Sequence, residues 1–232
     1  MSADIYSSGD YLVKNPTWHV EDSPWKANNI LKILNRNNIN PQSVCEVGCG
    51  AGEILKQLQS NLNQECEFWG YDISPQAFEL AQQRANEKLH FNLKDLLTEK
   101  DVFFDLILLI DLIEHLEDYF NFLRQLRAKS KYKLLHIPLD LSAQSILRKD
   151  RLMKARLSIG HIHYFTKETA LQSLVDVGYE VIDYFYTASA IDLKARSRLA
   201  ELAKMPRRLI FSLNPDLASR TLGGYSLMVL VK

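Results

Sequence analysis

The chain has 232 residues, 47% of them hydrophobic, which is enough for one substantial core, and its 28 basic residues balance 28 acidic ones. A net charge of zero gives no general attraction to nucleic acid, and no apolar run approaches the roughly 18 residues that a membrane span needs. The three cysteines have neither disulfide-framework nor metal-binding spacing. We therefore expect a single domain over 1–232, without a metal site or stable membrane insertion, in the cytoplasm.

The first half of the chain reads as a helix followed by alternating strands and helices. Ser23 and Pro24 predict the capped start of an amphipathic helix that ends before residue 40. The elements that follow are a strand at 44–47, a helix at 53–62, a strand at 67–71, a helix at 76–87 capped by Ser74, and a strand at 90–93.

The second half continues the alternation. It holds a strand at 104–110, a helix at 118–128, a strand at 133–139, a helix from Thr166 to Gly178, and strands at 179–186 and 225–231. The pattern predicts an α/β fold with a mostly parallel sheet, helices on both faces and an antiparallel edge. We treat 1–40 as an N-terminal helical segment, and 141–165 and 188–223 as candidate substrate-side insertions.

Glycines stand at 48, 50 and 52, between the first strand and its helix. Such glycines permit positive φ and let a ligand approach bare backbone. A dinucleotide-binding GxGxxG turn would have glycine where Glu53 stands, and a carboxylate there would repel a pyrophosphate. Glu46 adds negative charge that suits a cationic, amino-bearing ligand. The alternative is an ordinary glycine turn.

Acidic residues follow the next two strands. Asp72 ends the second strand about 20 residues beyond the glycines, where a carboxylate can accept hydrogen bonds from both ribose hydroxyls. Ile73 offers an apolar face to an adenine ring, and Asp95 follows the third strand, within reach of the adenine amino group. These residues indicate an adenosine-bearing ligand, with a helix-entry acid, a core isoleucine and a solvated loop acid as the alternatives.

Segments 44–53, 70–75 and 104–118 together resemble the class I S-adenosylmethionine-dependent methyltransferases, especially small-molecule enzymes such as the quinone-biosynthesis methyltransferases, and 160–166 matches more loosely. The resemblance implies a Rossmann-like seven-stranded sheet in the order 3-2-1-4-5-7-6 with the last strand antiparallel, and S-adenosyl-L-methionine as cofactor. From the motifs and this resemblance we predict these cofactor-binding residues: Glu46, Gly48, Gly50, Gly52, Asp72, Ile73, Asp95, Leu96 and Asp111.

Methylation of a hydroxyl releases a proton, and a histidine is the natural group to receive it. His115 is the first candidate, because it follows the fourth strand in the segment that resembles the family's Glu-His pair. His161 and His163 lie before the Thr166 cap and are further catalytic candidates. A packed structural histidine is the alternative at each position.

Charge is unevenly distributed and bears on the acceptor. Residues 1–140 hold 14 Lys/Arg against 20 Asp/Glu (net −6), and 141–232 hold 14 against 8 (net +6). Segment 145–158 is basic and amphipathic, so it is a candidate lid for a carboxylate- or phosphate-bearing small molecule methylated at oxygen. The other interpretations are a solvated helix whose apolar side packs on the core, and docking on an anionic membrane.

The N-terminal aromatics Tyr11, Trp18 and Trp25 are candidates to close over the cofactor, with core packing as the alternative. Two rival functions are open for the whole chain. One is a dehydrogenase-like nucleotide enzyme, and the other is a cofactor-binding regulatory protein without turnover. Neither the acceptor nor the oligomeric state follows from the sequence.

Overall fold

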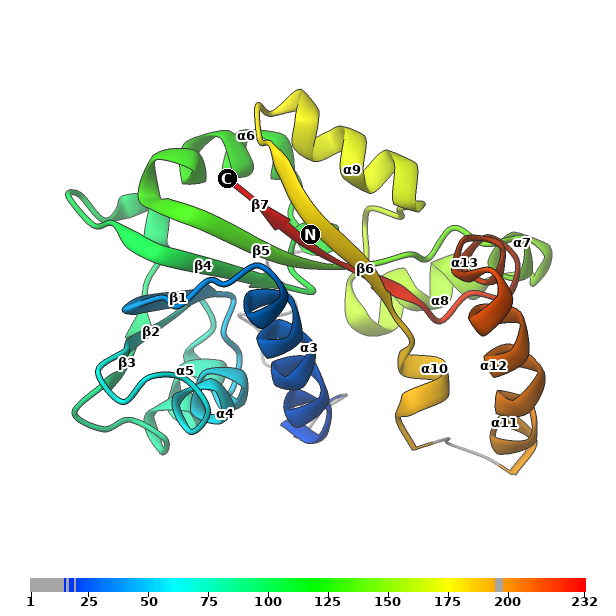
Figure 1. The fold of residues 1–232 in the computed structure, drawn as a ribbon, viewed down its shortest axis with the longest axis horizontal. Helices are drawn as coiled ribbons and strands as arrows, with labels where there is room; N and C mark the ends of the chain where they lie inside the picture. Colours follow the sequence, from blue (N-terminus) through cyan, green and yellow to red (C-terminus); the bar gives the residue numbers. More distant parts are fainter. Residues whose placement is uncertain (1–14, 16, 19, 195–197) are drawn as a thin grey trace.

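A computed structural model describes residues 15, 17–18, 20–194 and 198–232, and its centre is one seven-stranded sheet (Figure 1). The strands are β1 (Ser43–Val47), β2 (Glu67–Asp72), β3 (Leu89–Leu93), β4 (Phe104–Ile110), β5 (Ser130–Pro138), β6 (Val181–Thr187) and β7 (Ser226–Val231). Their order is β3-β2-β1-β4-β5-β7-β6. The first five strands run parallel, and β7 is antiparallel to both β5 and β6, so the predicted topology is confirmed.

Helices cover both faces of the sheet (Figure 1). One face carries α3 (Ser23–Arg36), α4 (Glu53–Gln59) and α5 (Pro75–Gln82), and the other carries α6 (Tyr119–Leu126) and α9 (Lys167–Asp176). The remaining α-helices lie beyond one end of the strands: α7 (Ala143–Leu147), α8 (Arg151–Ile159), α10 (Ser189–Asp192), α11 (Arg198–Leu202), α12 (Lys204–Leu213) and α13 (Pro215–Leu222). Among the described residues, no helix is long and apolar enough to cross a bilayer.

The apolar run of β4 divides its side chains between two cores. Leu106 and Leu108 join the cluster under α3 and α4, whereas Ile107 and Leu109 join the cluster under α6 and α9. Successive side chains of a strand point to opposite faces, so a strand covered on both sides must be apolar throughout. Burial of this run is a main source of the fold's stability.

Two of the three predicted helix caps are confirmed. The Ser74 hydroxyl accepts from the Ala77 N–H at the start of α5, and Thr166 forms a capping box with Thr169 at the start of α9. The predicted Ser23 cap is wrong. A 3-10 turn at Val20–Asp22 leads straight into α3, so Ser23 lies inside the helix and Asp22 takes the cap position without a side-chain bond.

The basic segment 145–158 forms two short helices rather than one amphipathic helix. Asp150 adopts φ 67° and breaks the segment between α7 and α8, so the apolar positions do not share one inward face. Leu147 is 85% exposed and Leu157 is 69% exposed. The interpretation that the apolar side packs on the core is therefore wrong.

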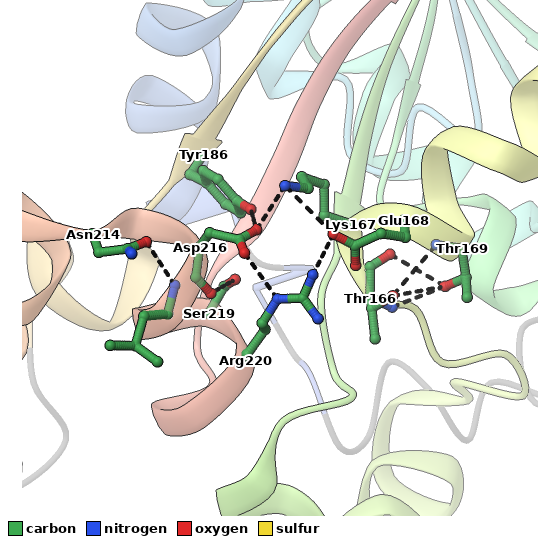
Figure 2. A network of polar contacts seen from close by, with 10 residues as sticks. Thr166, Lys167, Glu168, Thr169, Tyr186, Asn214, Asp216, Ser219 and Arg220 are labelled. Atoms are coloured by element: carbon green, nitrogen blue, oxygen red, sulfur yellow. Dashed lines mark hydrogen bonds and ion pairs between the residues drawn. The ribbon is translucent and has the colours of Figure 1, made fainter.

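A network of charged side chains ties α13 to α9 and β6 (Figure 2). The Asp216 carboxylate accepts from Lys167 Nζ at 2.7 Å, from the Tyr186 hydroxyl at 2.6 Å and from Arg220 Nε at 2.9 Å. Arg220 also reaches Glu168 on α9. The hydrogen bonds from these donors hold the pKa of Asp216 well below its usual range. This network anchors the segment between β6 and β7 to the sheet.

We expect Asp216→Asn to lower the free energy of unfolding at pH 7 by about 1 kcal/mol, since the 37% exposed carboxylate is partly screened by solvent. Because folding depresses this pKa, the contribution is present above the ordinary aspartate pKa of about 4 and disappears as the pH falls below it. Urea unfolding at several pH values measures the change in the free energy of unfolding and its dependence on pH. Glu87→Gln, at an exposed site, is the control, and a deficit that persists unchanged at pH 3 would contradict the assignment.

Candidate functional site

A cavity of about 680 Å³ opens at the carboxyl edge of the parallel strands. Its walls include residues that directly follow β1, β2, β3 and β4, namely Gly48, Ile73, Lys94 and Asp111. Open α/β sheets bind their ligands at this edge, because loops from several strands converge there. Further wall residues come from α3, α8 and α10, which close the sides of the cavity.

The glycine loop is held in place by backbone and carboxylate contacts. The Gly48 N–H donates to the Tyr71 carbonyl at 2.8 Å. The two Asp72 oxygens accept from the Gly50 N–H at 2.9 Å and from the Ser74 N–H at 2.8 Å. One carboxylate therefore fixes the turns after β1 and β2 against each other, and it faces the cavity.

Gly50 leaves room for an aromatic ring from the N-terminal segment. It has φ 54°, and a Cβ built there would lie 2.6 Å from the Trp18 ring. Trp18 and Trp25 both line the cavity, as expected of residues that close over a ligand, while Tyr11 lies outside the described residues.

Glu46 brings a buried carboxylate to the cavity. It is 2% exposed, and within the described part of the chain its Oε2 has no hydrogen-bond partner. Burial raises the pKa of Glu46 to about 8, and the negative charges of Asp72 and Asp111 add to this while Lys26 opposes it. A cation placed beside it would offset the cost of burying this charge.

Asp111 is the centre of a second polar group. It has φ 51°, which is strained for a residue with a side chain. Its oxygens bind Lys26 Nζ at 2.7 Å and His136 Nδ1 at 2.6 Å, and His136 Nε2 lies 2.8 Å from the Thr187 hydroxyl. Although burial opposes ionisation, Lys26 and His136 hold the pKa of Asp111 well below its usual range.

The three predicted histidines have different surroundings. His115 and His161 line the cavity with their rings 4.9 Å apart, but His163 does not line it. His163 Nε2 donates to the Leu116 carbonyl at 2.8 Å, and its ring packs on Tyr119. These contacts join the loop after β4 to the segment before α9.

Two predicted cofactor residues also lie outside the cavity. Gly52 is the cap residue before α4 and has a left-handed conformation, and a Cβ there would lie 2.4 Å from the ring of Phe91 on β3, so Gly52 faces packed core side chains. Leu96 is fully buried in the core. The other residues predicted to bind the cofactor line the cavity: Glu46, Gly48, Gly50, Asp72, Ile73, Asp95 and Asp111.

Glu114 lies behind the two cavity histidines. It is fully buried, and its Oε1 is 3.8 Å from His115 Nε2 and 3.9 Å from His161 Nε2. Burial raises the pKa of Glu114 well above its usual range and lowers that of His115 to about 4, so the His115 ring is neutral near pH 7. Among the described residues, Glu114, His115 and His161 bring metal-ligating atoms within 4.8 Å of one another.

Sequence reasoning missed Lys26, His136 and Glu114 as members of the site. Lys26 carried a usable signal, because a charged residue at i−4 from Ile30 and i−7 from Ile33 lies on the apolar face of α3. His136, inside β5, is hydrogen-bonded to Asp111 and Thr187 and also reaches the cavity wall.

The methyltransferase domain family matches residues 23–184, well over half of the chain. A curated relative, the norajmaline N-methyltransferase of Rauvolfia serpentina, is 32% identical over 93 residues, which are 37% of this chain. The match spans only 31% of that relative's length. The ajmaline N-methyltransferase of the same plant is 33% identical over an equally long match.

Solved structures share the fold. The plantazolicin methyltransferase BpumL in complex with SAH has a TM-score of 0.65 and 17% identity, covering 100% of this chain and 93% of that one. The magnesium protoporphyrin IX methyltransferase from Synechocystis PCC 6803 with bound SAH has a TM-score of 0.60 and 15% identity, covering 90% and 82% respectively. At these identities the likeness shows the architecture alone.

We expect Lys26→Met to lower the free energy of unfolding by about 1–3 kcal/mol, because the buried Glu46 and Asp111 lose their shared cation. Chemical unfolding at pH 7 measures the change. Lys32→Met, on the same helix but over the Phe185 ring rather than beside a carboxylate, should cost less. An equal decrease of the free energy of unfolding in the two variants would show that Lys26 does not stabilise the protein through the carboxylates.

Proposed function

The chain belongs to the methyltransferase domain family, and on that basis we propose that it transfers a methyl group from S-adenosylmethionine to a small-molecule acceptor. The observation that carries this proposal is one cavity wall that combines a bare glycine loop, the Asp72 carboxylate and the unpartnered Glu46 oxygen. These groups suit a ligand that has both a cationic amino acid part and a ribose.

The residues present fit this cofactor. We assign the Glu46 carboxylate to the amino group, since a buried carboxylate oxygen without a partner in the described structure needs a cation or a donor. We assign Asp72 to the ribose hydroxyls, because each of its oxygens retains a lone pair beside the backbone N–H that it already accepts. Ile73 is 60% exposed on the cavity wall and offers the adenine ring an apolar face.

When bound, S-adenosylmethionine supplies an activated methyl group, so the protein's own task is to position the acceptor and exclude water. Trp18 and Trp25 flank the cavity from the N-terminal side and are suited to that exclusion. His115 and His161 form the histidine wall, where a proton leaving the acceptor can be received.

For the acceptor we propose an acidic or phosphate-bearing metabolite methylated at oxygen. Support comes from the net positive charge of residues 141–232 and from the basic helix α8, whose last residues Ser158 and Ile159 line the cavity. In this proposal, α7–α8 and α10–α13 form the substrate side of a single domain. The narrower resemblance to quinone-biosynthesis methyltransferases stays a prediction, and the curated relatives named above are N-methyltransferases.

We expect Asp72→Ala to weaken binding of S-adenosylhomocysteine by about 1–3 kcal/mol, through loss of a charge-assisted contact to the ribose. Calorimetric titration measures the binding free energy, and titration with NADH tests the rival nucleotide ligand. Asp95→Ala removes the same charge from an exposed position on the same wall and should cost less. If Asp72→Ala binds normally, or if the protein prefers NADH, the cofactor assignment is wrong.

We expect His115→Ala to bind the cofactor almost normally and to transfer the methyl group about a hundredfold more slowly. Incubation with methyl-labelled cofactor and fractionated metabolites follows the transfer. A fast variant would remove His115 from the chemistry. Tight cofactor binding by the unaltered protein with no labelled product from any fraction would favour a regulatory protein instead.

A further inference from the structure

The Glu114 carboxylate is a buried charge site that the methyl-transfer proposal does not use. It is fully buried in the 3-10 turn Ile113–His115, and neither of its oxygens has a hydrogen-bond partner among the described residues. An isolated carboxylate in the protein interior is costly unless a cation or donors compensate it. Lys26 offsets part of this charge through space, but no described group donates a hydrogen bond to the carboxylate.

Two imidazoles lie close to this carboxylate, and the Nδ1 atom of each already has a partner. His115 Nδ1 lies 3.1 Å from the Gly160 carbonyl, and His161 Nδ1 lies 2.6 Å from an Asp140 oxygen. A carbonyl or carboxylate oxygen can only accept, so each Nδ1 carries the proton. In the tautomer with the proton on Nδ1, Nε2 is the ring atom that can bind a metal, and both Nε2 atoms are on the side of Glu114.

Three potential ligand atoms, one from each residue, thus converge within 4.8 Å of one another. The Nε2 to Oε1 separations of 3.8 Å and 3.9 Å are too long for hydrogen bonds. They are close to the roughly 3.4 Å that separates ligands around a tetrahedral ion with bonds of about 2.1 Å. Small side-chain rotations would complete the coordination.

The surrounding contacts are those of a metal site. A histidine ligand normally donates its other ring N–H to a carboxylate or a backbone carbonyl, which fixes the tautomer and the ring orientation. Asp140 does this for His161, and Gly160 does it for His115. Both histidines line the cavity, so the remaining coordination position faces the space left for the acceptor.

We propose that Glu114, His115 and His161 bind one divalent transition-metal ion of the zinc type, open toward the acceptor side of the cavity. Two imidazoles and one carboxylate favour such an ion over magnesium or calcium, which prefer oxygen ligands. If the proposed function holds, the ion takes as its fourth ligand an oxygen of the acceptor, which makes an oxygen-bearing acceptor the favoured class. His115 and His161 then act as ligands of the ion and not as the groups that receive the acceptor's proton. This proposal reverses the expectation from sequence that the chain has no metal site.

The test uses the full chain, stripped with a chelator and dialysed against Zn²⁺. We expect one zinc per chain by elemental analysis, and loss of at least tenfold in affinity in His161→Ala and Glu114→Gln. His163→Ala is the matched control, since it removes a histidine two positions away that lies outside the cavity, and it should retain one zinc. Circular dichroism checks that each variant is folded.

Asp140→Asn provides a second, milder variant that touches no ligand atom. Loss of such a supporting carboxylate should weaken zinc binding about 10- to 100-fold. Zinc should also raise the melting temperature of the unaltered protein but not that of Glu114→Gln, because only a bound ion stabilises the folded state. Co²⁺ substitution should give visible absorption bands that disappear in His115→Ala.

Absence of zinc binding above background in the unaltered protein would overturn the proposal. Equal losses in His161→Ala and His163→Ala, or preference for Mg²⁺, would overturn it as well. Titration of the same samples with S-adenosylhomocysteine separates the two proposals. If the protein binds the cofactor but no zinc, only the metal-site proposal is wrong. If it binds zinc but not the cofactor, only the proposed function is wrong.

Discussion

The Asp72 carboxylate is the contact on which the cavity depends. By accepting the N–H groups of Gly50 and Ser74, it locks the turns after two neighbouring parallel strands into one rigid edge. A glycine loop has little conformational preference of its own, so this contact and the backbone bond from Gly48 to Tyr71 define its shape. The same carboxylate is exposed to the cavity, and the group that builds the edge is therefore available to a ligand.

The second feature of the site is a set of buried carboxylates. Glu46, Asp111 and Glu114 lie around one cavity, where desolvation disfavours their charged forms. Asp111 is compensated by Lys26 and His136, but Glu46 and Glu114 keep oxygens without a partner in the described structure. These two carboxylates with unpartnered oxygens are where we place the cationic amino group and the metal ion.

The elements themselves were largely predictable, because hydrophobic period and cap chemistry are local properties. The apolar run 104–110 and the Ser74 and Thr166 caps agree with the structure. The predictions of local structure were wrong where the backbone conformation differs from the one that the residue pattern indicates. A 3-10 turn displaces the cap from Ser23, and the left-handed Asp150 divides a segment whose spacing suggested one helix.

By itself, the sequence determined the α/β class, the glycine loop and the acids at the strand ends, since strand ends in a parallel sheet must share one edge, and the strand order followed from the family resemblance. Only the tertiary structure decided which side chains meet across that edge. His161 joins Glu114 from a loop 47 residues away, and Lys26 reaches Asp111 from the helix before β1. Such contacts depend on side-chain direction and on long-range packing, which no local spacing encodes.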